Sequence, residues 1–269
     1  MKNIIFIPYI KRQKNLTGKS SIGHSNRHQG YEYGINSWKA WAKKNGHEVY
    51  IMSDLLCSES EMLITWQRWQ VLNILEHNQI DYDQVLVVDA DSIVHPDCPN
   101  FFEMTDKKFT STLTDGDFEW INRAINGYSK MFFDKDYCLP SFEFFQTGFV
   151  IINKEHKDFF NKVFKFYETN KQKIIDSYDI LLTGSDITLM NCMRKEFGLE
   201  LNLLPRQFGM MDMVRKNLFY YHPQCWWEDD LTFLYNSGWV YQFNAIPKND
   251  MGRDRTYWMK RVYKELYNE

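Results

Sequence analysis

The segment QVLVVDAD, at residues 84–91, decides how this chain folds. Its four consecutive apolar residues, 85–88, show no polar alternation, which is typical of a parallel-sheet strand that is buried on both faces. Two aspartates, Asp89 and Asp91, follow at once. Because ligands of open α/β sheets bind beyond the carboxyl ends of the strands, this pair is expected at a ligand-binding edge.

Outward from this segment, short apolar runs alternate with segments of helical spacing. Strands are expected at residues 3–8, 47–53, 109–113, 149–153, 199–205 and near 231–243. Helices are expected from 31 to a stop at 45–46, around 60–77, at 155–170, from near 185 to 198, and from about 254. The alternation predicts an α/β fold, a Rossmann-like three-layer α/β/α arrangement around a mostly parallel mixed sheet. No repeat or linker divides the sequence, so one domain over 1–269 is expected.

The composition narrows the class of protein. Of 269 residues, 44% are hydrophobic and 25% charged, as in a folded enzyme, and the 17% that are aromatic belong either to a thick core or to rings that stack on ligands. The formal charge of −3 argues against general nucleic-acid binding, which needs clustered lysine and arginine. The five cysteines form no CxxC pair, so neither a disulfide framework nor a zinc site is expected. No apolar run has the length of a membrane span or a signal peptide, which predicts a cytoplasmic location.

The Asp-x-Asp tripeptide occurs four times, starting at residues 81, 89, 115 and 134, so the tripeptide alone carries no information. Only Asp89 and Asp91 follow a buried strand. Two carboxylates in that place can hold Mg²⁺ or Mn²⁺, because these ions favour oxygen donors and leave coordination positions for phosphate. The alternative is that Asp89 caps a turn and Asp91 is solvated.

Four segments, in order, resemble those of glycosyltransferases of the GT-A type, in particular the retaining glycogenin-like and galactosyltransferase-like group. They are YDQVLVVDADSIVHPDCPNFFE (82–103), FFQTGFVIIN (144–153), GSDITLMN (184–191) and LLPR (203–206). The resemblance covers roughly residues 65 to 210. It implies a GT-A fold with a nucleotide-binding half at about 1–105 and a donor-sugar and acceptor half at about 106–269.

The resemblance also assigns roles to individual residues. It places the cation on Asp89 and Asp91, and it places the donor sugar against Gln146 and Asp186. The residues that it assigns to the nucleotide are Pro8, Tyr9, Asp54, Arg68, Ala90, Lys248, Arg253 and Arg255. The alternatives are ordinary ones: a helix cap for Asp186, since Asp is favoured there, a turn cap for Asp54, and solvated surface charges for the arginines and Lys248.

The chain departs from the family near its C-terminal end. The family has a His-Phe-x-Gly segment whose histidine completes the metal site, and Gln242 stands in that place here, within Tyr241-Gln242-Phe243-Asn244. An amide oxygen can bind Mg²⁺ or Mn²⁺, although it carries no charge and is the weaker donor. His222 is the other candidate for the third ligand.

The function that the resemblance implies is transfer of a hexose or pentose, with Mn²⁺ or Mg²⁺, from a nucleotide-diphosphate sugar that is expected to be UDP-linked. Retention of configuration is expected; an inverting enzyme would need a carboxylate base, for which Asp115 and Asp117 are the candidates. The acceptor stays open. A glycan is one alternative, and hydroxymethylated bases are another, because some glycosyltransferases of phages and large viruses modify such bases in DNA.

Two other functions remain open at this point. A sugar-1-phosphate nucleotidylyltransferase shares the layered fold, but it usually has a G-x-G-T-R loop after the first strand, and this chain has only Gly18 and Gly23 there. A degenerate sugar-binding module is the alternative without an enzyme, and Gln242 in place of histidine is the one feature that favours it.

Overall fold

A computed structural model gives the fold and describes residues 2–10, 29–114, 117–181, 186–211, 231–232, 234–244, 246 and 252–268. Lys248, His222 and Asp115 lie outside these residues, as does most of the polar loop after the first strand.

The centre of the fold is a six-stranded sheet in the order β2-β1-β3-β6-β5-β7. The strands are β1 (Ile4–Pro8), β2 (Glu48–Met52), β3 (Val85–Val88), β5 (Phe109–Leu113), β6 (Phe145–Ile152) and β7 (Leu201–Leu203). Only β6 runs antiparallel to its neighbours, β3 and β5, and the other pairings in this sheet are parallel. A separate two-stranded sheet pairs β4 (Ser92–Val94) with β8 (Val240–Gln242). The mostly parallel mixed sheet predicted from the sequence is therefore confirmed.

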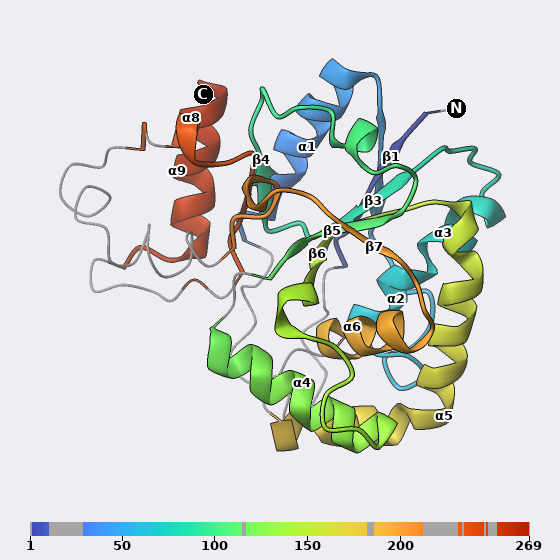
Figure 1. The fold of residues 1–269 in the computed structure, drawn as a ribbon. Helices are drawn as coiled ribbons and strands as arrows, with labels where there is room; N and C mark the ends of the chain where they lie inside the picture. Colours follow the sequence, from blue (N-terminus) through green and yellow to red (C-terminus); the bar gives the residue numbers. More distant parts are fainter. Residues whose placement is uncertain are drawn as a thin grey trace.

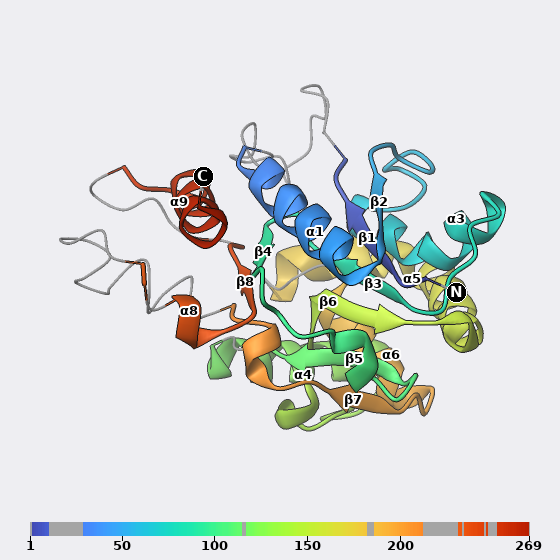
Figure 2. The same ribbon diagram turned by 90° about the horizontal axis from the view of Figure 1, so that it is seen from above.

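The helices cover both faces of this sheet (Figures 1 and 2). The α-helices are α1 (Tyr31–Asn45), α2 (Ile64–Gln67), α3 (Val71–His77), α4 (Phe118–Phe133), α5 (Lys157–Leu181), α6 (Ile187–Glu196), α8 (Leu234–Ser237) and α9 (Arg255–Tyr267). Short 3₁₀ helices are η2 (Arg68–Gln70), η3 (Phe101–Met104), η4 (Ser141–Glu143), η5 (Lys154–His156) and η6 (Arg206–Phe208).

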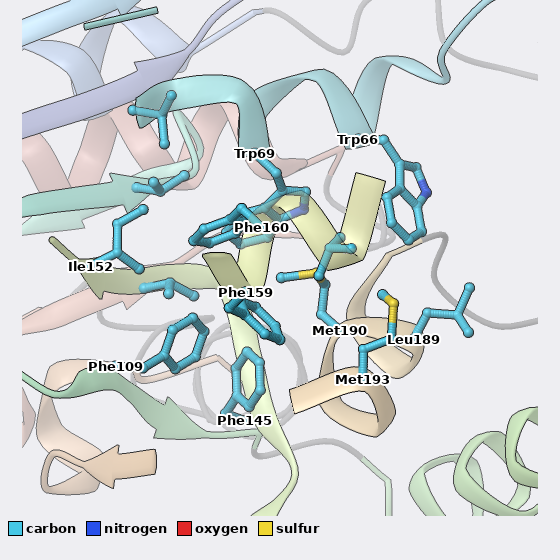
Figure 3. Packing of buried hydrophobic residues seen from close by; sticks show 14 of the residues in the cluster. Trp66, Trp69, Phe109, Phe145, Ile152, Phe159, Phe160, Leu189, Met190 and Met193 are labelled. Carbon is cyan, nitrogen blue, oxygen red and sulfur yellow. The ribbon is translucent and has the colours of Figure 1, made fainter. Parts of the chain in front are cut away.

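The alternation of side chains along β1 shows how the layers form. Ile5 and Ile7 pack into one apolar cluster with Trp38 and Trp41 of α1. Ile4 and Phe6, which point to the opposite face because strand side chains alternate, pack into another cluster with residues of α2, α3, α5 and α6. Figure 3 shows part of that second cluster, in which Trp69 stacks on Phe160 with ring centroids 5.8 Å apart.

The helix predicted around 60–77 is observed only from residue 64 onward, and it includes a 3₁₀ segment. Residues 58–63 form a turn, and the rest is divided among α2, η2 and α3. The buried Gln67 amide accepts a hydrogen bond from the Leu56 backbone N–H (2.8 Å) and donates to the carbonyl oxygens of Cys57 and Met62 (3.0 and 2.8 Å). These tertiary contacts hold the first part as a loop and override the local helical pattern.

The prediction of strands near 231–243 is correct only for its last part. Residues 234–237 form the helical turn α8, and the strand is limited to Val240–Gln242. The amide of Leu234 donates to the Leu231 carbonyl and that of Tyr235 to the Thr232 carbonyl, which is the i to i+3 bonding of a tight turn. The helix expected from about 254 is confirmed as α9.

Candidate active site

The Asp89–Asp91 turn lies where β3 ends and β6 begins. Val88 pairs with Phe149, and the Asp89 amide donates to the Gly148 carbonyl at 3.1 Å. The chain then turns tightly into β4, with the Ser92 hydroxyl donating to the Asp89 carbonyl at 2.6 Å. The carboxylate pair therefore stands at the predicted edge of the sheet, on a turn that the backbone fixes.

Helix α1 approaches this turn so closely that only glycine fits at position 34. A Cβ atom there would lie 2.3 Å from the Ala90 carbonyl oxygen and 2.6 Å from that of Ser92. The Trp38 indole N–H also donates to the Ser92 hydroxyl at 3.0 Å. Ala90 is buried beneath this contact, which holds the turn in one position.

Arg68 joins two carboxylates that come from distant parts of the chain. Its Nη1 lies 2.6 Å from Asp89 Oδ1, and its Nη2 lies 2.6 Å from Asp186 Oδ2. Nε of Arg68 and the indole N–H of Trp69 also donate to Asp186 Oδ2, at 3.2 and 2.9 Å. Arg68 is buried, so the alternative of a solvated surface charge does not apply to it.

Burial and neighbouring charges have opposite effects on the pKa values of Arg68 and Asp89. Burial lowers the pKa of Arg68, but the carboxylates of Asp186 and Asp89 outweigh it and hold that pKa above its ordinary value. Burial raises the pKa of Asp89, Arg68 offsets part of the rise, and the charge of Asp186 adds to it. With both carboxylates ionised, two negative charges share one guanidinium, so the cluster retains a net attraction for a cation.

Asp186 stands at the N-cap position of α6, but its side chain makes no capping hydrogen bond. Its bonds to Arg68 and Trp69 instead all use Oδ2, and the described residues give Oδ1 no hydrogen bond that would occupy it. Asp117, by contrast, does cap a helix, because its carboxylate accepts from the amides of Glu119 and Trp120 at 2.9 and 3.3 Å. Asp186 therefore does not cap α6, whereas Asp117 caps α4 and is for that reason a poor candidate for a catalytic base.

Gln242 lies beside both aspartates. It pairs with Ser92 across β4 and β8, and the next amide, of Phe243, donates to the Asp91 carbonyl at 2.8 Å. A Cβ atom on Gly148 would lie 2.7 Å from Asp89 Oδ2 and 3.2 Å from both Oε1 and Nε2 of Gln242. The side chains of Asp89 and Gln242 therefore meet over Gly148, where any larger residue would collide with them.

The Gln242 amide is also incompletely bonded. It is buried, and its Nε2 has no hydrogen-bond partner in the described structure. A buried amide without a partner costs about 1–3 kcal/mol, and its oxygen and nitrogen exchange places by a flip about the last side-chain bond. Two carboxylates and one amide oxygen form a donor set that fits Mg²⁺ or Mn²⁺. The described residues contain no group of three or more His, Cys, Asp or Glu that could hold a metal, and His222, the other candidate for the third ligand, lies outside them.

Asp91 has an arginine beside its carboxylate. Asp91 is buried, which excludes the solvated alternative, and its Oδ2 lies 3.9 Å from Nη1 of Arg255. The Arg255 guanidinium lies over the Tyr31 ring, 4.7 Å from its centroid, and donates to the Tyr31 hydroxyl at 3.2 Å. Tyr9, which follows Pro8 at the end of β1, has its ring 6.0 Å from that of Tyr31. Pro8, Tyr9 and Arg255 therefore lie near the aspartate turn, and their assignment to the nucleotide stays a prediction.

Gln146 is buried at the start of β6. Its Nε2 contacts the Thr112 hydroxyl, and its Oε1 has no hydrogen-bond partner among the described residues. The amide fits closely under Gly209, where a Cβ atom would lie 2.0 Å from Nε2. Gln146 therefore offers an unsatisfied acceptor at the same end of the sheet as Asp89.

Two expected residues are not brought into this group. Asp54 is exposed beyond β2 and accepts a hydrogen bond from the neighbouring Ser53 hydroxyl, the kind of local turn contact that was its alternative. Arg253 lies over the rings of Tyr257 and Trp258, at 5.1 and 5.6 Å.

The sequence reasoning missed Trp69 and Tyr31. Trp69 is adjacent to Arg68 in sequence, so its neighbour was a usable signal. No local sequence feature indicated that Tyr31 belongs to the site, because its partner Arg255 is 224 residues away.

No family model matches this sequence, and no curated protein matches it. Solved structures of similar fold do match. An active-site mutant of LgtC is 12% identical, with a TM-score of 0.50, over 98% of this chain and 95% of that one. The apo form of mouse xyloside xylosyltransferase 1 is 9% identical, with a TM-score of 0.50, over 92% of this chain and 99% of that one.

The bifunctional glycosyltransferase WbbM is 11% identical, with a TM-score of 0.51, over 99% of this chain and 51% of that chain, so the present chain spans about half of WbbM. All three are glycosyltransferases, and the GT-A fold expected from the sequence is confirmed. Among the residues described, no helix combines the length and apolar character needed to cross a membrane.

Proposed function

We propose that this chain is a glycosyltransferase that uses Mg²⁺ or Mn²⁺ to transfer a sugar from a nucleotide-diphosphate donor. The observation that carries the proposal is that the side chains of Asp89 and Gln242 meet over Gly148, with Asp91 on the same turn. A UDP-linked hexose or pentose as donor, and retention of configuration, belong to the proposal through the resemblance of the four sequence segments.

In the reaction, the bond from the anomeric carbon to the diphosphate oxygen breaks, and a bond from that carbon to an acceptor hydroxyl oxygen forms. The hydroxyl proton passes to the departing phosphate or to solvent. Asp89, Asp91 and Gln242 would hold the cation, which when bound offsets the charge of the diphosphate.

The remaining residues bind and orient the donor. Tyr9 and Arg255 stand where β1 ends, where an aromatic face and a guanidinium suit a base and a phosphate. Asp186 Oδ1 and Gln146 Oε1 are the acceptors available to sugar hydroxyls. Arg68 fixes the Asp89 and Asp186 carboxylates relative to each other. It would thereby hold the cation site and the sugar site at a fixed relative position.

The test measures release of free nucleotide from UDP-glucose, UDP-galactose, UDP-xylose and GDP-mannose, with Mn²⁺, with Mg²⁺ and with a chelator. We expect release from at least one donor, dependent on the metal and absent in Asp91→Ala. Asp81→Ala is the matched control: it changes another Asp-x-Asp carboxylate, which is exposed and bonded to Lys154.

Failure to release nucleotide from any of these donors contradicts the proposal. Nucleotide-sugar binding without release would indicate a sugar-binding module instead. Formation of sugar-1-phosphate that requires pyrophosphate would indicate a nucleotidylyltransferase.

A further inference from the structure

Two phenylalanines are the most exposed large apolar side chains among the described residues. Phe118 begins α4 and is 73% exposed, and Phe142 lies in η4 and is 71% exposed. We propose that Phe118 and Phe142 form an acceptor platform that binds the apolar ring faces of a saccharide. The proposal rests on the glycosyltransferase function proposed above and makes a glycan its acceptor.

The platform belongs to the end of the sheet that carries the candidate active site. Phe142 lies just before β6, the strand that carries Gln146, and Phe118 follows β5, whose Thr112 contacts Gln146. The two segments meet directly, because the Thr114 amide donates to the Phe144 carbonyl at 2.9 Å. Helix α4 lies below β6 in Figure 1.

A second contact links the two segments behind the platform. The Trp120 ring of α4 packs against the ring of Phe144, with centroids 6.1 Å apart and planes at 85°. Phe118 and Phe142 are each two residues from this contact. The segments that carry Phe118 and Phe142 are therefore packed against each other.

The exposed rings stand on fixed backbone. Glu143, beside Phe142, bonds Arg194 at 2.6 Å and Lys195 at 3.1 Å. The carbonyl of Phe118 accepts a hydrogen bond from the Asn122 side chain at 2.7 Å, and Asp117 caps the helix at that point. Each ring is exposed and so lacks the hydrophobic stabilisation that burial would give. The residues next to it in sequence are nevertheless held in place by these bonds. Exposed apolar surface on a rigid support marks a binding surface.

The charges around the platform favour a neutral saccharide. The acidic side chains nearby are Asp117, Glu119 and Glu143, and the basic ones are bonded to them: Arg123 to Glu119 at 2.8 Å, and Arg194 and Lys195 to Glu143. Nucleic acid and anionic lipid need unpaired lysine and arginine for their phosphates. A pyranose ring instead offers C–H groups on its face, which suit an aromatic ring, and hydroxyls at its edge, which donate to carboxylates and amides.

The test uses the full chain, with maltohexaose, cellohexaose, chitohexaose and xylohexaose as probes in saturation-transfer NMR. We expect at least one of them to receive saturation on its ring C–H protons. The double variant Phe118→Ala with Phe142→Ala should weaken that affinity at least about tenfold. The same variant should raise the acceptor KM by a similar factor and leave release of nucleotide to water unchanged. Met104→Ala, which removes a side chain that is 41% exposed on η3, is the control and should bind as the unaltered protein does.

Lack of binding to every probe, or equal binding by the double variant, would overturn the platform. Binding of duplex DNA or of phosphatidylglycerol vesicles that the double variant loses would also overturn it, and would indicate a different acceptor. These outcomes are separate from failure of the proposed function, which appears as absence of nucleotide release from every donor by the unaltered protein.

Discussion

Replacement of Arg68 by methionine removes the guanidinium that lies between the carboxylates of Asp89 and Asp186. Removal of one partner from a buried ion pair costs about 3–5 kcal/mol, because the other charge stays buried without compensation. Asp186, with a side chain only 7% exposed, carries most of this penalty, whereas Asp89 is 36% exposed and is partly relieved by water. We therefore expect Arg68→Met to lower the free energy of unfolding by about 3 kcal/mol at neutral pH.

The loss of stability in Arg68→Met should depend on pH, and the charge of the buried carboxylates determines the direction. Burial raises the pKa of Asp89, and without Arg68 nothing offsets that rise, so the pKa of Asp89 in the folded state lies above its value in the unfolded state. The folded variant then binds more protons than the unfolded chain, so its stability rises as the pH falls. The difference in stability from the unaltered protein should therefore narrow as the pH falls through that raised pKa.

Urea denaturation followed by tryptophan fluorescence measures both effects. Arg123→Met is the matched control: its guanidinium pairs with Glu119 on the surface of α4, and the change should cost at most about 1 kcal/mol. If Arg68→Met is too unstable to purify, Arg68→Met with Asp186→Asn should recover stability, because it removes the buried charge. A loss below about 1 kcal/mol at neutral pH, or a loss that does not change with pH, would refute the role of Arg68 as a buried counter-ion.

The other predictions concern single sites. Gly148→Ala places a methyl group 2.7 Å from Asp89 Oδ2; it should weaken metal-dependent nucleotide binding in calorimetry by about ten- to a hundredfold, and unchanged binding would contradict the site. Gly34→Ala places a methyl group 2.3 Å from the Ala90 carbonyl oxygen. It should lower the free energy of unfolding, measured by denaturation, by about 1–3 kcal/mol, and a neutral effect would show that α1 can shift. Burial lowers the pKa of His156 from 6.5 to about 4. The unfolded state therefore takes up the proton first, stability falls as the pH drops from about 6.5 to about 4, and His156→Gln should flatten that part of the curve.

Sequence patterns predicted the parts of this molecule that depend on local burial. The run at 85–88 predicted β3 because a strand that is covered on both faces needs apolar residues throughout. The direction of β6 could not be predicted in this way, since periodicity reports which residues are buried and not which strand lies beside them. The loop at residues 58–63 was missed for a related reason, because hydrogen bonds between the Gln67 side chain and the backbone of Leu56 and Met62 hold it.

The candidate site was predicted to a similar degree. Asp89, Asp91 and Gln242 were proposed together, and the structure places them on adjoining strands and turns. The ion pair from Arg68 to Asp186 joins residues 118 positions apart, and nothing in the local pattern of either one indicates the other. Physical complementarity across such distances is a property of the folded chain, so it appears only when the strands are assembled.

Because β6 runs antiparallel to its neighbours, sequence changes before β6 have a different effect from changes at the aspartate turn. The hydrogen bond from Asp89 to Gly148 fixes how β3 and β6 align, and the aspartate turn depends on that alignment. The segment before β6 carries Phe142 and enters the sheet from outside, because β6 starts at this edge whereas its neighbours finish there. Substitutions or insertions in that segment change the surface before β6 and leave the alignment of the two strands intact. Under the proposed function, the acceptor could therefore change in the course of evolution while the donor site is kept.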